Sequence, residues 1–463
     1  MKSLVGVKAH AQAVRRLRES YEALPAGAPV RLAKRTSNLF RDRMTSDQAG
    51  LDVAGLGGVI ALDPVARTAD VQGMCTYEDL VRTTLPHGLI PMVVPQLRTI
   101  TLGGAVTGLG IESTSFRNGL PHESVLEMDV FTGAGDVVTA LPRGEHAQLF
   151  KSFPNSYGSL GYATRIRIEL EQVPPAVELR HVRFDDLDTL AKTVEVVVAD
   201  RAWDGIAVDA LDGVVFGPHE AYLSLATFTT QTGRTSDYTG QQIYYRSLQA
   251  RAADSLTMND YLWRWDTDWF WCSRAFGAQN PTLRRMWPRR WRRSDVYHRL
   301  VALEARFGIL ARIEARQGKP QRERVVQDVE VPLDRTAEFL HWFDDTVGMR
   351  PVWLCPLRLR EPAGAGSASA WPSYPLEPGL TYVNVGFWGA VPRRQGARDG
   401  EVNIAVEDMV TGLGGHKSLY SDAYYDRATF DRLYGGENLA KVKQQYDPGD
   451  RLTGLYDKAV KRR

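Results

Sequence analysis

Glycines gather in one short segment of the chain, at a spacing that suits contact between the backbone and a ligand. Residues 99–119 read TITLGGAVTGLGIESTSFRNG, and a strand-forming run over 99–102 leads into Gly103, Gly104, Gly108 and Gly110. Glycine lets a backbone approach another group closely, and such a loop offers N–H groups to a polyanion. Ser113 stands where the third glycine of the dinucleotide fingerprint GxGxxG would lie, and no clear helix opens there. The segment predicts a cradle for a phosphate or cofactor, with an ordinary structural turn as the alternative.

A second segment combines positive charge with indole rings. Residues 284–293 read RRMWPRRWRR, which is six Arg and two Trp in ten residues. Arginine with interfacial Trp is typical of contact with an anionic bilayer surface. A solvated or salt-bridged loop is one alternative, and a site for single-stranded nucleic acid is another. Because the net charge of the chain is only +2, we predict no nucleic-acid partner. Of the remaining interpretations, membrane-surface contact through Arg284–Arg293 is favoured over a solvated loop.

Periodicity predicts the elements that hold the glycine run in place. An amphipathic helix is expected from about Tyr77 to Leu85, and a hairpin over 124–140 with its turn at Gly133–Gly135. Residues 153–171 (FPNSYGSLGYATRIRIELE) place a second glycine loop before an alternating strand. The first 24 residues form a further amphipathic helix, not a secretory signal.

The second half of the chain alternates strands with helices. Residues 173–178 (VPPAVE) are predicted to cross from a first domain to a second. Strand patterns follow in HVRFDDL, GIAVDAL, DGVVFG and AYLSLATF, and helical patterns in TLAKTVEVVVAD and TAEFLHWFDDTV. An antiparallel sheet with helices on one face is the simplest arrangement. Residues 361–379, rich in Ala, Gly, Ser and Pro, are predicted to form a mobile surface loop.

Composition bounds the class of protein. At 463 residues the chain exceeds one ordinary core, so two joined domains are expected. Its hydrophobic content of 43% and charged content of 24% are typical of soluble globular proteins, and no apolar run is long enough to span a bilayer. Three widely spaced cysteines, Cys75, Cys272 and Cys355, suit a reducing cytosol. The nine histidines include no HxH or HExxH spacing, so no metal site is predicted.

The order of these elements resembles the flavin-binding domain of the vanillyl-alcohol-oxidase, or p-cresol methylhydroxylase (PCMH), family. In that family a TxGG loop and a later GxLG loop lie along FAD, and the matching residues are 101–104 and 158–161. The resemblance implies a two-domain α+β fold with an FAD-binding PCMH-type domain over 1–175. A substrate cap built on an antiparallel sheet would follow over 176–430, and residues 431–463 would pack back on the FAD domain.

Later stretches look like the 24-dehydrocholesterol (delta24-sterol) reductases, flavoproteins that saturate an isolated side-chain alkene. The matching stretches are VVQDVEVP (325–332), PVWLCPL (351–357), LYSDAYYD (419–426) and GIESTS (110–115). Actinobacterial relatives of those enzymes reduce a 10-methylene branch on a fatty acyl chain to a 10-methyl (tuberculostearic-type) branch. The present chain looks closer to these.

The resemblance implies FAD as the cofactor. The loop LAKRTSNLFR (32–41) takes the place that wraps the FAD diphosphate, with a helix cap as its alternative. No histidine lies between His10 and His87, so FAD is expected to bind non-covalently. His122 is an outside candidate for a covalent bond, and a surface histidine is its plainer interpretation. The predicted cofactor-binding residues are Arg35, Thr36, Ser37, Asn38, Thr101, Leu102, Gly103, Gly104, Gly108, Gly110, Ile111, Glu112, Ser113, Ser159 and Gly161.

The expected reaction needs a proton donor. An isolated alkene has no carbonyl to polarise it, so hydride from the flavin must be matched by a proton delivered to the other carbon. Asp328, Asp422 and Glu112 are the acids in the matching motifs. Each would serve if burial raises its pKa, and each also suits a cap or a salt bridge.

The aromatic segment YLWRWDTDWFW (261–271) would stabilise a developing cation through its π faces, or simply pack in the core. Trp263 and Trp265 stand where the sterol reductases have His, which implies a changed substrate pocket. Cys355 is expected to be a packing thiol. The predicted catalytic residues are Tyr261, Arg264, Asp328 and Asp422.

Together these features predict an FAD-dependent reductase that takes hydride from NADPH and saturates a double bond in a lipid. A 10-methylene fatty acyl chain of a phospholipid is the leading substrate, and a delta24-sterol-type side chain is the nearest alternative. An FAD-dependent oxidase or dehydrogenase of an alcohol or sugar and a non-catalytic lipid-binding subunit are the other classes. Family analogy adds a lipid methyltransferase as partner and a cytoplasmic location, peripheral at the inner face of the membrane.

Overall fold

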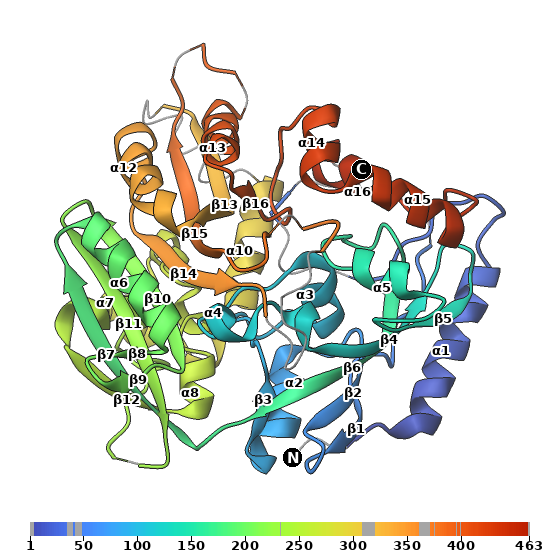
Figure 1. Cartoon of the computed structure of the whole chain (residues 1–463), viewed down its shortest axis with the longest axis horizontal. Coiled ribbons are helices and arrows are strands. Elements are labelled where there is room, and N and C mark those ends of the chain that lie inside the picture. The colour runs from blue at the N-terminus through green and yellow to red at the C-terminus, as the bar shows by residue number, and fades with distance from the viewer. Residues whose placement is uncertain are drawn as a thin grey trace.

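Two antiparallel sheets with helices around them make up the chain, so the predicted α+β fold is confirmed (Figure 1). The structure is a computed structural model that describes residues 4–34, 40–41, 49–231, 233–307, 320–360, 371–374, 376–394, 396–398 and 400–461. Within that part of the chain no helix is both long and apolar enough to cross a membrane.

The first sheet belongs to the N-terminal third of the chain. Its strands run in the order β1-β2-β6-β4-β5, and β3 pairs with β6. The strands are β1 (Val59–Asp63), β2 (Thr68–Gln72), β3 (Leu89–Pro91), β4 (Val125–Phe131), β5 (Val137–Ala140) and β6 (Tyr162–Gln172). Its helices are α1 (Gly6–Glu22), α2 (Tyr77–Thr84), α3 (Leu102–Gly108), α4 (Ser115–Asn118) and α5 (Ala147–Ser152). The predicted N-terminal helix, the helix near Tyr77 and the hairpin are therefore confirmed.

The glycine run contains a helix where a strand and a loop were expected. Thr101 caps α3 by accepting a hydrogen bond from the N–H of Gly104 at 3.2 Å. A Cβ on Gly103 would stand 2.6 Å from the carbonyl oxygen of Gly73, and one on Gly73 would stand 1.9 Å from that of Ala163 in β6. Glycine therefore lets α3 pack directly on backbone, and this packing overrides the low helix propensity of the segment.

The second sheet has the order β12-β7-β11-β10-β14-β15-β13-β16, and every pairing in it is antiparallel. Its strands are β7 (Ala176–Phe184), β10 (Ala210–Gly217), β11 (Glu220–Thr229), β12 (Ala253–Thr257), β13 (Arg322–Pro332), β14 (Val352–Arg358), β15 (Thr381–Pro392) and β16 (His416–Lys417). The predicted strand GIAVDAL begins only at Ala210, because Ile206–Ala207 (β9) pairs with Ala202–Trp203 (β8) in a small hairpin. The chain passes from the first sheet to the second at residues 173–175.

The two faces of the second sheet have different partners. Helices α6 (Leu187–Asp200), α12 (Thr336–Thr346) and α13 (Glu401–Gly412) cover one face. Along β14, Val352 and Leu354 pack in the core beneath these helices, whereas Trp353 and Cys355 pack in the core shared with the first domain. Strand alternation thus directs an aromatic face toward the first domain.

The remaining helices belong to neither of these two groups. They are α7 (Tyr244–Ala250), α8 (Met258–Leu262), α9 (Pro281–Met286), α10 (Ser294–Phe307), α14 (Arg427–Leu433), α15 (Gly436–Tyr446) and α16 (Leu455–Ala459). Helix α15 returns to the first domain, where Asn438 Nδ2 donates to Ser152 Oγ of α5 at 2.8 Å. Helices α14, α15 and α16 are red in Figure 1.

Part of the loop predicted over residues 361–379 is buried in a hydrophobic core. Tyr374 and Leu376 are buried and pack with Leu120 and Leu357. The prediction of a surface loop is therefore wrong at these two residues, because apolar contacts hold them inside. Residues 361–370 and 375 lie outside the described residues.

Candidate active site

A cavity of about 1370 Å³ opens between the first domain, the second sheet and the C-terminal helices. Typical small-molecule sites measure roughly 300–1,000 Å³, so this cavity has room for two ligands. Two walls of different chemistry line it. We call them the cationic wall, formed by Arg31, Lys34, Arg427, Lys443, Arg451 and Lys458, and the aromatic wall, formed by Trp269, Phe270, Trp353 and Trp388.

The cationic wall is assembled from segments far apart in the sequence. Arg451 Nε donates to the carbonyl of Ala28 at 2.9 Å, and Lys458 Nζ donates to the carbonyl of Tyr157 at 3.0 Å. Two buried side-chain donors at the cavity, Gln96 Nε2 and Arg451 Nη2, have no hydrogen-bond partner in the described structure. Because a buried donor without a partner is costly, these atoms suit a ligand with acceptor oxygens.

The glycine run also reaches the cavity, but its N–H groups are not bare. Leu102 donates to the carbonyl of Cys75, Gly103 to that of Gly73, and Gly104 to the hydroxyl of Thr101. The prediction that these three groups are offered to a polyanion is wrong, since they hold α3 against the sheet. The run contributes a smooth glycine surface instead.

The predicted cofactor residues divide into three groups. Those that line the cavity are Thr101, Gly103, Gly104, Gly108, Gly110, Ile111 and Gly161. Those that lie buried and away from its lining are Leu102, Glu112, Ser113 and Ser159. Those outside the described residues are Arg35, Thr36, Ser37 and Asn38.

His122 is buried, so its interpretation as a surface histidine is wrong. Its ring packs edge-on against Trp371 with centroids 4.4 Å apart, and burial lowers its pKa to about 3. It does not line the cavity, and no described lining residue is a histidine or cysteine. Non-covalent FAD stays a prediction.

The aromatic wall is built from the second sheet and the segment after α8. The Phe270 ring lies 4.3 Å from that of Trp388 and 5.3 Å from that of Trp353, between centroids. Trp269 and Phe270 both have positive φ, 47° and 58°, and non-glycine residues adopt such angles only at a cost. Strain of this kind persists where surrounding packing fixes it, and it often occurs at functional sites.

Asp328 of β13 lies in the cavity wall beside these rings. Its Oδ1 accepts a hydrogen bond from Asn384 Nδ2 at 3.1 Å, and Tyr420 also bonds to its carboxyl group. Trp388 Nε1 donates in turn to the hydroxyl of Tyr420 at 2.8 Å. Burial raises the pKa of Asp328 to about 6, although both hydrogen bonds oppose the shift. Asp328 therefore gains and loses its proton near pH 6, well above the range of an ordinary aspartate.

The space that the Asp328 carboxyl group occupies is left free by a glycine on the neighbouring strand. Gly386 of β15 pairs with Asp328, and a Cβ there would stand 2.4 Å from Asp328 Oδ1 and 2.7 Å from the Trp388 ring. Any larger residue at this position would require the Asp328 carboxyl group or the Trp388 ring to move.

Tyr261 and Arg264 lie in a buried charge cluster behind the aromatic wall. Arg264 Nη2 bonds to Asp212 Oδ2 at 2.8 Å, and the guanidinium carbon lies 4.0 Å from the centre of the Tyr261 ring. Ser113 Oγ lies 2.6 Å from Glu112 Oε1 and 2.8 Å from Tyr261 Oη. Burial raises the pKa of Glu112 to about 7, although Arg264 opposes the shift. Neither Tyr261 nor Arg264 lines the cavity, so their predicted catalytic role would be one of positioning.

Asp212 connects this cluster to the cavity. Its Oδ2 accepts hydrogen bonds from Trp265 Nε1 at 2.9 Å and from Trp353 Nε1 at 3.4 Å. Trp265 stacks in turn on Phe270, with centroids 4.9 Å apart. The cluster thereby orients the aromatic wall, a role that the sequence reasoning missed because Asp212 belongs to no recognised motif.

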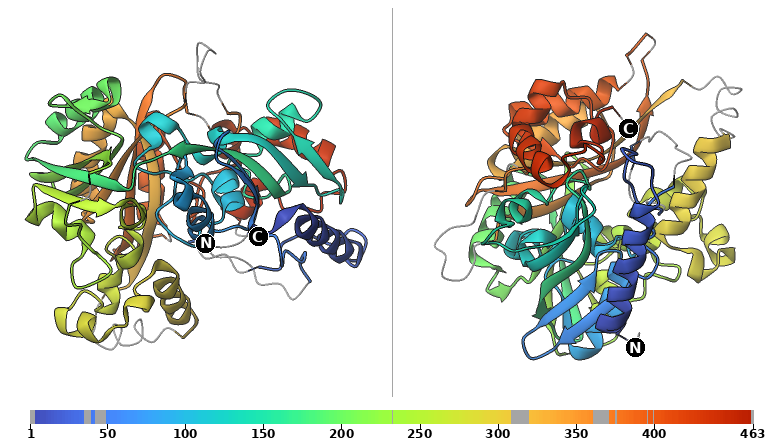
Figure 2. Two further views of the ribbon diagram at one scale, coloured as in Figure 1. Left: turned by 90° about the horizontal axis from the view of Figure 1, so that it is seen from below. Right: turned by 90° about the vertical axis from the view of Figure 1, so that its right-hand side faces the viewer.

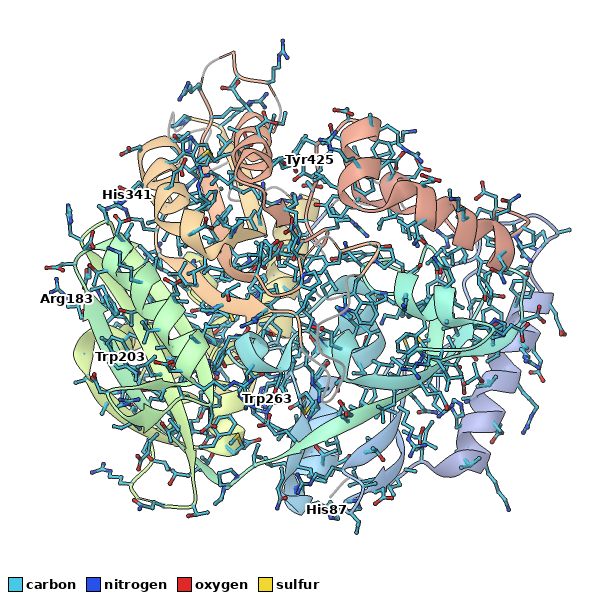
Figure 3. The ribbon with its side chains drawn as sticks, viewed as in Figure 1. His87, Arg183, Trp203, Trp263, His341 and Tyr425 are labelled. Atoms are coloured by element: carbon cyan, nitrogen blue, oxygen red, sulfur yellow. The ribbon has the colours of Figure 1, made fainter. Side chains whose placement is uncertain are left out.

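Three further predicted residues lie away from the cavity lining. Asp422 forms an ion pair with Arg324 at 2.6 Å, so the structure does not bring this carboxylate to the site. Trp263 and Trp265 are buried, and Trp263, labelled in Figure 3, lies beneath the guanidinium group of Arg98. Neither residue lines the cavity, and Trp265 acts on its wall only through Phe270, so the changed substrate pocket stays a prediction.

Comparisons with known proteins agree with this geometry. Residues 3–141 match the FAD binding domain family. The Delta(24)-sterol reductase of Arabidopsis thaliana is 23% identical over 452 residues, covering 89% of this chain and 77% of that protein. The mouse (Mus musculus) Delta(24)-sterol reductase is 24% identical over 426 residues, covering 87% and 74%. Cytokinin dehydrogenase 6 of Oryza sativa subsp. japonica is 35% identical over 146 residues, covering 32% and 27%.

The chain is an FAD-linked oxidoreductase that resembles the Delta(24)-sterol reductases. The cavity of this oxidoreductase fits FAD, because the cationic wall and the unpartnered Gln96 and Arg451 donors suit a diphosphate. The glycine surface allows a flat or extended ligand to lie close to the backbone. Most of the cationic wall comes from residues 427–458, which carry no local motif that sequence reasoning could have used.

Proposed function

We propose that this oxidoreductase reduces an isolated carbon–carbon double bond in a lipid, with a sterol-type side chain as the leading substrate. The observation that carries the proposal is Asp328, whose pKa is raised to about 6 in a cavity wall otherwise rich in indole and phenyl rings. Such a site combines a proton donor with an apolar surface, and an unactivated alkene requires both. Similarity to Delta(24)-sterol reductases over 87–89% of the chain supports the same reaction class.

The chain's own residues have two roles in the reaction. FAD, when bound and reduced, supplies hydride to one carbon of the alkene. Asp328 delivers a proton to the other carbon and regains one from solvent afterwards. Phe270 and Trp388 exclude water and stabilise positive charge on the more substituted carbon through their π faces. NADPH is the proposed electron donor, and its two electrons balance the reduction of the double bond.

A 10-methylene acyl chain of a phospholipid is the second candidate substrate. It requires the same hydride and proton, and the observation that favours it is an exposed basic and apolar surface near residues 283–291, which suits a substrate held in a bilayer. A lipid methyltransferase partner, which would form the methylene branch, belongs to this second proposal alone. We place the sterol-type side chain first because sterol reductases are the relatives that match most of the chain.

An anaerobic flavin titration tests the proposal. The purified protein with FAD is bleached with NADPH and then mixed with either a Delta(24)-sterol or vesicles of a 10-methylene phospholipid. Recovery of the flavin absorbance, with a saturated product identified by mass spectrometry, is the expected result for one of the two. Recovery with air alone would overturn the proposal in favour of an oxidase, and rapid bleaching by an alcohol or sugar would favour a dehydrogenase.

A further inference from the structure

The six arginines of residues 284–293 have two different environments. Three of them point inward. Arg284 forms a bidentate ion pair with Asp268 at 2.6 and 3.0 Å, Arg292 donates to the carbonyl of Thr239 at 2.8 Å, and Arg293 pairs with Glu78 at 2.9 Å. These contacts fix the backbone of the segment on the body of the protein. The prediction that the whole segment faces a membrane is therefore wrong for these three residues.

The other half of the segment faces solvent. Arg285, Arg289 and Arg290 are exposed, and Arg290 lies over the Trp291 ring, with 5.6 Å from its guanidinium carbon to the ring centroid. Between them lie exposed apolar side chains, Leu283 at 50%, Met286 at 78% and Trp291 at 49%. Among the described residues Trp291 is the one exposed Trp. No acidic residue occurs in 281–293. We call the six residues Leu283, Arg285, Met286, Arg289, Arg290 and Trp291 the basic apolar patch.

Helix α10 connects the basic apolar patch to the wall of the cavity. Helix α10 follows the patch directly, and His298 of α10 lies 5.5 Å from Phe40 and 6.0 Å from Trp269, between ring centroids. Both Phe40 and Trp269 line the cavity. The region of α9 and α10, yellow in Figure 2, projects from the side of the second sheet.

We propose that the basic apolar patch docks this protein on an anionic lipid bilayer. Exposed arginines attract anionic headgroups, while Trp and Met insert at the depth of the headgroups. Charge complementarity selects this occupant, since the patch holds three arginines and the one ion pair described for them joins Arg289 to the exposed Asp237 at 3.3 Å, which leaves the surface with an excess of positive charge. Because inward ion pairs hold the segment rigid, docking costs little conformational entropy. This docking does not depend on which substrate the cavity takes.

Vesicle co-sedimentation of the full chain with FAD tests this inference without any turnover. The vesicles are phosphatidylcholine alone or an equal mixture of phosphatidylcholine and phosphatidylglycerol. We expect binding to the anionic vesicles, and we expect added salt to weaken it because screening shortens the reach of the arginines. Replacing the three arginines (R285S/R289S/R290S) should weaken binding at least tenfold, as should M286S/W291S.

Matched control variants test whether binding depends on this patch in particular or on the total number of exposed arginines and apolar side chains. R15S/R18S/R143S removes three exposed arginines elsewhere, and V65S/L380S removes two exposed apolar side chains elsewhere. Both controls should bind within twofold of the parent, and all variants should keep the parent's thermal unfolding and FAD content. Equal binding by the patch variants, or equal binding to neutral vesicles, would overturn the proposal. So would retention of single-stranded DNA, or a patch-dependent dimer, without vesicle binding.

Discussion

The two walls of the cavity differ in how they are built as well as in their chemistry. The cationic wall combines short segments from both ends of the chain, joined by hydrogen bonds such as those from Arg451 to Ala28 and from Lys458 to Tyr157. The aromatic wall comes from one sheet face and one neighbouring segment, and a buried charge cluster orients it from behind. Different parts of the fold therefore supply the two walls, so that one cavity can bind a charged diphosphate on one side and an apolar substrate on the other.

The largest expected effect is at the acid of the aromatic wall. Asp328→Asn should lower the rate of alkene reduction by about 10²–10⁴-fold, because an amide cannot deliver the proton. Bleaching of the flavin by NADPH should stay within twofold, and anaerobic stopped-flow absorbance measures both steps. Asp422→Asn is the matched control, since Asp422 pairs with Arg324 away from the cavity. A larger loss for the control than for Asp328→Asn would contradict the assignment.

The same acid predicts a pH dependence. The carboxyl group of Asp328 has its pKa raised to about 6, so the fraction that carries a proton falls as the pH rises through that value. The alkene step should therefore slow by about tenfold per pH unit above pH 6 to 7, while flavin reduction should not follow the same curve. A pH–rate profile of the second half-reaction measures this, and a flat profile from pH 5 to 9 would exclude Asp328 as the donor.

The next largest effect is expected when an arginine of the cationic wall is replaced, and it should appear in the affinity for FAD. Arg451→Gln should weaken FAD binding by about 10–100-fold, because a charged hydrogen bond contributes roughly 1.5–3 kcal/mol. The FAD-saturated variant should reduce the alkene at the parental rate, which separates the two walls. Arg432→Gln, on the exposed surface of α14, is the control, and quenching of flavin fluorescence gives both affinities.

The charge cluster behind the aromatic wall should affect stability with pH. The pKa of Glu112 is raised in the folded state, so its stabilising contribution is complete below the unfolded value near 4.3 and is lost as pH rises through about 7. The free energy of unfolding of the parent should therefore fall by about 3–4 kcal/mol over this range through this group. Glu112→Gln removes that slope, and urea unfolding at pH 5 and pH 8 measures the difference. An unchanged slope would show that Glu112 ionises freely.

The smallest expected change is at the aromatic wall itself. Trp388→Phe keeps a ring against Phe270 but removes the hydrogen bond to Tyr420. We expect KM for the lipid to rise by about threefold to tenfold, since the bond and part of the ring surface are worth roughly 1 kcal/mol. FAD affinity should not change, and an equal loss in both constants would mean that the two walls are coupled.

Local pattern was enough to predict most of the fold. Strand patterns at 181–187 (HVRFDDL) and 221–228 (AYLSLATF) predicted β7 and β11 of the second sheet, and apolar spacing predicted α2, α6 and α12. Helix α3 could not be predicted, because its glycines form a helix only by packing on Gly73. The burial of Ser373, Tyr374 and Leu376 could not be predicted either, since it depends on partners distant in the sequence, as in the bond from Asn155 to the carbonyl of Ser373.

The site was less accessible to sequence reasoning than the fold. In the sequence, Asp328 and Asp422 are equally good candidates for the proton donor, because each lies in a motif that resembles the family. The pairing of β13 with β15 places Asp328 in the cavity wall. The arginines of 284–293 look alike in sequence, yet their partners Asp268 and Glu78 lie on other segments. Long-range pairing, which no local window contains, decides which charged groups face a ligand.

The walls of the cavity run in sequence from Pro29 to Lys458. During synthesis the first sheet leaves the ribosome while the residues that supply most of the positive charge are still untranslated. The cofactor site is then open on the side that α14, α15 and α16 later cover. We therefore expect tight binding of FAD only after α14, α15 and α16 have been synthesised, and we expect the aromatic wall to be exposed to solvent until then.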